Sequence, residues 1–66
     1  MTKITLNGEP REVSAQTIAE LLREVGAPTR GIAVALNDSV VRRTELEATP
    51  LHAGDRVELI RAVQGG

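Results

Sequence analysis

The chain has 66 residues, a net charge of −1 from 8 Lys+Arg against 9 Asp+Glu, and neither cysteine nor any aromatic residue. A chain of this length forms one small domain with too little core to enclose a substrate cleft, which favours a binding or carrier role over catalysis. The balanced charge and absent aromatic rings argue against nucleic-acid binding, and the absent cysteines exclude a disulfide, a thiolate metal site and a cysteine nucleophile.

No segment indicates export or a membrane. The opening residues lack the apolar run of a signal peptide, and no stretch approaches the ~20 apolar residues of a membrane span. The expected location is therefore the cytoplasm, with no membrane partner.

Two strands joined by a tight turn are predicted first. Residues 2–6 alternate apolar and polar side chains, which is the period of a half-buried strand. Asn7-Gly8 indicates a type I′ hairpin turn, because both residues tolerate a positive φ. Residues 9–13 should return antiparallel, and Pro10 places them at a sheet edge because it has no N–H to donate.

A single amphipathic helix is predicted next. Thr17 and Glu20 have the spacing of a capping box, in which the hydroxyl and the carboxylate accept hydrogen bonds from early amide groups. An apolar stripe follows at positions 18, 21, 22 and 25, and Gly26 should end the helix in a left-handed conformation. So short a helix does not persist alone, so it must lie across a sheet.

Residues 31–37 form an apolar run in which large side chains alternate with Ala33 and Ala35, which predicts an interior strand. The large side chains should lie under the helix, where the burial of each contributes about 1.5–3 kcal/mol. The alanine face is smooth. It either docks a partner or fills the space beside crowded neighbouring strands.

The next segment is more polar. Residues 37–38 predict a turn, residues 40–41 a short strand, and Leu46 anchors one expected helical turn. Arg42 and Arg43 either form a solvated surface or contact an acidic partner.

The last third of the chain predicts a turn and a final strand. His52 has no second histidine or cysteine nearby, which favours a surface position over a metal site. Residues 53–55 form a tight turn and residues 56–63 the final strand, although the alternation does not settle on which face Arg61 lies.

The order of elements predicts an α+β fold, with one main helix on a mixed sheet of four to five strands. If the first and last strands pair in parallel at the sheet centre, residues 64–66 extend as a flexible tail from a domain formed by residues 1–63. That tail is Gln64-Gly65-Gly66. A terminal Gly-Gly arises by chance in roughly 0.5% of chains, and taken alone it also fits a frayed terminus.

Taken together, these features resemble the ThiS family, the ubiquitin-like β-grasp sulfur carriers of bacterial thiamin biosynthesis. The resemblance covers the whole chain, and one departure is Leu46, where family members often carry an aromatic residue. Its supporting features, in order, are the Asn7-Gly8 hairpin, the helix start at 17–22, the segments 34–37 and 41–43, the Gly54-Asp55 turn, and the run 57–60 leading into 62–66.

The resemblance implies a carrier protein rather than an enzyme. Gly66 would be adenylated by a separate E1-like activating enzyme, converted to a thiocarboxylate with sulfur from a donor such as a cysteine desulfurase system, and used by thiazole synthase. Gln64, Gly65 and Gly66 would form the tail that enters the partners' channels. No catalytic residue, bound cofactor or metal is expected in this chain, and ATP would be bound by the partner, since the chain has no Gly-rich phosphate loop.

Three alternatives stay open at the level of sequence. The small subunit of molybdopterin synthase shares the fold, the Gly-Gly end and the thiocarboxylate. A ubiquitin-like protein modifier would instead join Gly66 to a lysine. A plain interaction domain would carry the same tail without using it.

Overall fold

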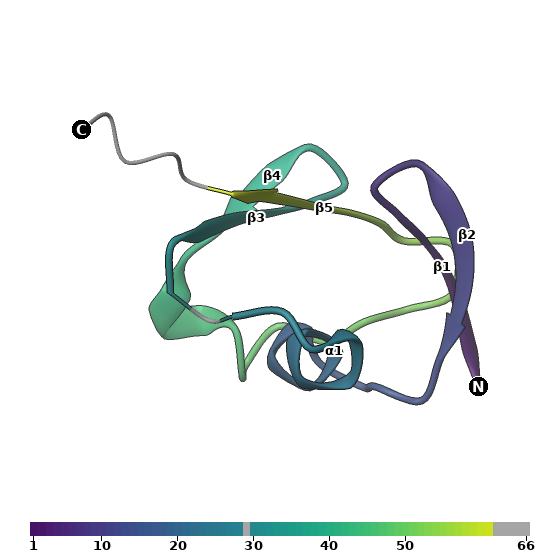
Figure 1. Cartoon of the computed structure of the whole chain (residues 1–66). Helices are drawn as coiled ribbons and strands as arrows, with labels where there is room; N and C mark the ends of the chain where they lie inside the picture. The colour runs from purple at the N-terminus through teal and green to yellow at the C-terminus, as the bar shows by residue number, and fades with distance from the viewer. Residues whose placement is uncertain (29, 62–66) are drawn as a thin grey trace.

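The computed structural model describes residues 1–28 and 30–61. Its five strands form one mixed sheet in the order β2-β1-β5-β3-β4, and α1 lies across one face of it (Figure 1). The predicted α+β architecture with one main helix is therefore confirmed. The elements are β1 (Thr2–Leu6), β2 (Glu9–Val13), α1 (Ile18–Val25), β3 (Ile32–Leu36), β4 (Ser39–Val41), the 3-10 turn η1 (Arg43–Glu45) and β5 (Arg56–Arg61).

The last strand lies at the centre of the sheet. β5 pairs in parallel with β1 and antiparallel with β3, as the expected arrangement of first and last strands requires. Its last described residue, Arg61, pairs with Ile32 at the start of β3. Ile32 packs against the core, so this register places Arg61 on the helix side of the sheet, which the alternation in the sequence did not settle. Residues 62–63 of the predicted strand lie outside the described residues.

Both hairpins use the predicted turn chemistry. Asn7 and Gly8 have φ of 51° and 84°, and Asn37 and Asp38 have φ of 51° and 73°. Positive φ at both central positions is the geometry of a type I′ turn, whose twist matches that of the flanking strands. Pro10 lies in β2 at the edge of the sheet, as predicted.

The helix begins and ends at the predicted residues. Thr17 Oγ1 accepts a hydrogen bond from the Glu20 amide at 3.1 Å, and the Glu20 carboxylate accepts one at 2.8 Å from the amide of Gln16, one residue before the cap. Gly26 has φ of 74° and its amide donates to the Arg23 carbonyl. The Ala27 amide donates to the Leu22 carbonyl, which completes a Schellman ending.

The core lies between α1 and the sheet. Segment 43–51 closes it: Leu46 is 6% exposed, and its carbonyl accepts a hydrogen bond at 3.0 Å from the amide of Ala19 in the first turn of α1. Leu46 is thus the predicted anchor of the short helical turn. The buried core residues are Ile4, Val13, Ala15, Ile18, Ala19, Leu21, Leu22, Val34, Leu46, Leu51 and Val57.

Candidate functional site

The residues predicted to carry function, Gln64, Gly65 and Gly66, lie outside the described residues. The boundary between a domain of residues 1–63 and a tail of residues 64–66 therefore stays a prediction. What the structure does describe is β5, the strand that leads towards them. The candidate site is accordingly β5 together with the surfaces beside it.

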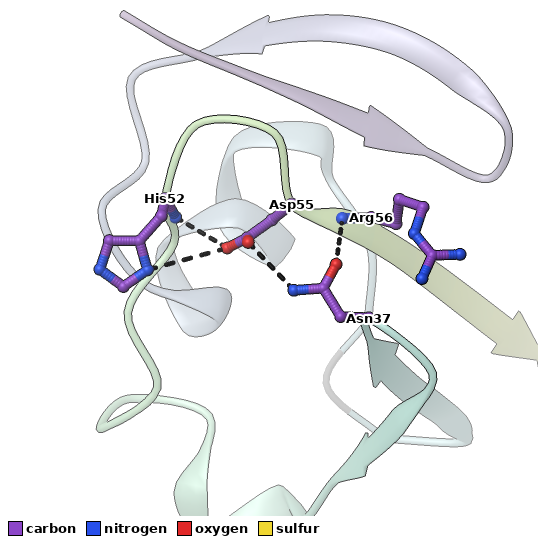
Figure 2. A network of polar contacts seen from close by, with 4 residues as sticks. All are labelled: Asn37, His52, Asp55 and Arg56. Carbon is purple, nitrogen blue, oxygen red and sulfur yellow. Dashed lines mark hydrogen bonds and ion pairs between the residues drawn. The ribbon is translucent and has the colours of Figure 1, made fainter.

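The start of β5 is held by a network of polar side chains (Figure 2). The Asn37 side chain accepts a hydrogen bond from the Arg56 amide at 2.8 Å and donates one to the Asp55 carboxylate at 3.1 Å. The other oxygen of Asp55 accepts from the His52 amide at 2.8 Å. The network ties the β3–β4 turn to the turn that precedes β5, so the strand starts from a fixed position.

A second asparagine holds β5 farther along. Asn7 Oδ1 accepts a hydrogen bond from the amide of Leu59 at 2.8 Å. Sequence reasoning assigned Asn7 and Asn37 only to their turns and missed these contacts. A turn asparagine carries no local signal of a partner, because the amide that it binds is distant in the sequence.

The sheet face opposite α1 is open and partly apolar. Register places Ala33, Ala35, Val40 and Ile60 on this face of β3, β4 and β5. Val40 is 78% exposed and Ile60 55% exposed, and no element among residues 1–28 and 30–61 covers them. We call these four residues the apolar face. Ala33 on this face is exposed and Ala35 is half-buried, and the use of the face as a docking site stays a prediction.

Charged residues border the apolar face at the end of the sheet where β5 starts. Arg56 Nη2 lies 3.0 Å from Asp38 Oδ2, and this exposed pair lines a hollow of about 180 Å³ together with Ala35 and Glu58. His52 is exposed, as predicted, with its Nδ1 4.0 Å from Asp55 Oδ2.

Two kinds of feature are absent from the part of the chain that the structure describes. It contains no group of three or more His, Cys, Asp and Glu side chains placed to hold a metal ion. None of its helices has the length and apolar character needed to cross a membrane.

Comparisons with known sequences agree with one another. The profile of the ThiS family matches residues 4–66. The sulfur carrier protein ThiS of Thermus thermophilus is 41% identical over 63 residues, which cover 96% of this chain and 98% of that protein. A thiazole synthase of Paramagnetospirillum magneticum is 34% identical over 65 residues. The matched segment covers 97% of this chain but 20% of that protein.

A solved structure agrees as well. The crystal structure of thiamine biosynthesis protein ThiS from Geobacter metallireducens superposes with a TM-score of 0.86 at 32% identity, covering 98% of this chain and all of that one. This similarity, with the mixed sheet and single helix, confirms the predicted ubiquitin-like β-grasp fold. On the sequence profile and the fold together, the chain belongs to the ThiS family.

Proposed function

We propose that this chain is the sulfur carrier of thiazole formation in thiamin biosynthesis. In this proposal the carboxylate of Gly66 is adenylated by a separate activating enzyme, becomes a thiocarboxylate, and gives its sulfur to thiazole synthase. The observation that carries it is the match over nearly the full length of both chains to a protein described as a sulfur carrier. The family match also extends through Gly66.

The thiazole synthase relatives support the choice of acceptor. Two proteins of that name, from Paramagnetospirillum magneticum and Magnetococcus marinus, contain a segment similar to 97% of this chain. A carrier-like segment in the same polypeptide as a synthase fits a partnership between the two, because linkage raises their effective concentration. This favours thiazole synthase over molybdopterin synthase as the destination of the sulfur.

The chemistry needs activation, because a carboxylate is a poor acyl donor. A carboxylate oxygen of Gly66 attacks the α-phosphorus of ATP and pyrophosphate leaves. A sulfide-equivalent sulfur, supplied by a donor such as a cysteine desulfurase system with a thiol reductant, then forms a C–S bond as the C–O bond to AMP breaks. Gly65 and Gly66 have no side chain, so they suit a narrow channel and leave the attacked carbon unhindered.

The apolar face is proposed as the surface on which the partners dock. It lies on β5, on the neighbouring strand β3 and on the edge strand β4, so a partner that covers it also lies next to the strand leading to the tail. The burial of Val40 and Ile60, both exposed here, would contribute the apolar area that a standard interface needs at its centre. Recognition and reaction are thus assigned to different parts of one chain.

Intact-mass analysis tests the proposal. The chain is incubated with the activating enzyme, ATP and a sulfur donor, and the expected product has one oxygen of Gly66 replaced by sulfur. A matched reaction without ATP should leave the mass unchanged. An unchanged mass in the complete reaction, with an enzyme that modifies the Thermus thermophilus relative, would contradict the proposal.

A further inference from the structure

Basic side chains gather at the end of the molecule towards which β5 runs. Arg61, the last described residue of β5, pairs with Ile32, so Arg30 lies at the same end of the sheet. In Figure 1 the segment entering β3 and the turn η1, which begins at Arg43, lie on the side where β5 ends. The basic end is therefore the end from which the chain continues into residues 62–66.

Three arginines at this end surround one hollow of about 340 Å³. Arg23 comes from the last turn of α1, Arg30 from the connection to β3, and Arg43 from η1. The side chains of Leu46 and Ala19, 6% and 4% exposed, form its apolar part. An apolar floor lowers the local dielectric, which strengthens an ion pair formed above it.

The hollow has a surplus of positive charge that the described residues do not neutralise. Glu47 is the one acidic residue among the described residues that line it. Within residues 1–28 and 30–61, the ion pairs are Arg56–Asp38 and His52–Asp55, so no arginine of the hollow takes part in one. The net charge of the chain is −1, but the three arginines gathered at the hollow create a local positive potential that attracts acidic groups.

We propose that Arg23, Arg30 and Arg43 receive carboxylate side chains of the activating enzyme beside the channel that takes up the tail of residues 64–66. The inference rests on the proposed function, because the position of the hollow beside the exit of the tail selects this partner. The planar guanidinium matches a carboxylate in two parallel hydrogen bonds, so the contact also orients the approaching chain. Long-range attraction would raise the rate of encounter and make it dependent on salt.

The test is a double charge reversal, Arg30→Glu with Arg43→Glu. Arg23 is left in place, because a cation in the last turn stabilises the helix. The matched control is Lys3→Glu with Arg11→Glu on β1 and β2, which changes the net charge equally. In ATP–pyrophosphate exchange at low salt, we expect the first variant to raise the KM for the carrier about tenfold with little change in kcat, and the control to change neither by more than about twofold.

Salt dependence gives a second measurement, and its wild-type part needs no variant. Added NaCl should raise the KM of the wild-type carrier steeply, and that of the Arg30→Glu/Arg43→Glu variant much less. Circular dichroism and thermal melting establish that both variants are folded. A wild-type KM that does not respond to salt would overturn the inference even if the variants fail to fold.

Further outcomes separate the inference from the proposed function. An equal KM in wild type and double variant, or an equal rise in the control, overturns the inference and leaves the proposed function standing, because wild-type exchange measures that function by itself. No exchange with wild type, using a competent enzyme, overturns both. Saturable binding of inorganic phosphate at the hollow, with the KM for the carrier unaltered in the Arg30→Glu/Arg43→Glu variant, would identify a small-anion site. That result would also overturn the inference.

Discussion

Asn37 ties the β3–β4 turn to the turn that precedes β5 through one carboxamide. Its oxygen accepts from the amide of Arg56, its nitrogen donates to Asp55, and Asp55 in turn accepts from the amide of His52. Its backbone has φ of 51°, which asparagine tolerates better than most residues. A glycine at position 37 would therefore keep the turn conformation but lose the side-chain contacts.

Asn37→Gly should lower the free energy of unfolding by about 1–2 kcal/mol, because two hydrogen bonds are lost while the positive φ is kept. Asp38→Gly is the matched control: it lies in the same turn with φ of 73° and loses only the exposed pair with Arg56, worth about 0–1 kcal/mol. Urea unfolding measures both. Equal losses in the two variants would show that the Asn37 side chain does not stabilise the start of β5.

For individual residues, the sequence predicted backbone conformations better than long-range contacts. The positive φ of Asn7 and the left-handed Gly26 were predictable, because each depends on the residue itself and its near neighbours. The bond from the Leu59 amide to Asn7 was not, because it joins residues 52 positions apart. The tail residues Gln64 to Gly66 were singled out by composition and resemblance, and the described structure does not reach them.

Among the elements, β4 carries the most exposed part of the apolar face. It is an edge strand of three residues, so its side chains contribute little to the core. Val40 and Ser39 are both exposed and, being neighbours in a strand, lie on opposite faces of the sheet. Ser39 pairs with Leu36, which packs against the core, so Val40 belongs to the open face.

Val40→Arg should raise the KM for adenylation about tenfold, because a charge at the centre of an interface that is buried on binding costs about 1–3 kcal/mol. Ser39→Arg introduces the same charge on the same strand but on the other face, beside Leu36 at the end of β3 away from Arg30, so its KM should stay near the wild-type value. Both variants should melt within a few degrees of wild type. A similar KM in the two variants would contradict the assignment of the apolar face to docking.

The arrangement of the elements shows where local sequence information ends. The alternation in residues 31–37 predicted which face of β3 packs on α1, since Val34 is 3% exposed and Ala33 is exposed. In β5, Arg61 comes two residues after Leu59 and four after Val57, so it faces the same side of the sheet as they do. The charge of its side chain does not predict this face, which follows from the register with β3. The sequence did not predict the parallel pairing of β1 with β5 and could only assume it, because this pairing joins the two ends of the chain.

For the whole molecule, the proposal separates a folded domain from a reacting terminus. The residues that the structure describes, of which Arg61 in β5 is the last, form a five-stranded sheet and a buried core. Gly65 and Gly66 have no side chains to bury, so they cannot contribute to an apolar core. Stability and reactivity should therefore respond to different changes in the chain.

Deletion of Gly65 and Gly66 tests that separation. The circular dichroism spectrum and melting temperature should match those of the full chain, whereas ATP–pyrophosphate exchange should fall to background, because the new terminal carboxylate belongs to Gln64 and does not reach the acyl-transfer position. A Leu21→Ala variant is the converse control: Leu21 is fully buried, so the change should cost about 2–5 kcal/mol of stability with the terminus left intact. If the truncated chain unfolds, the terminal glycines belong to the fold, and the assignment of Gly66 to a separate reacting tail is wrong.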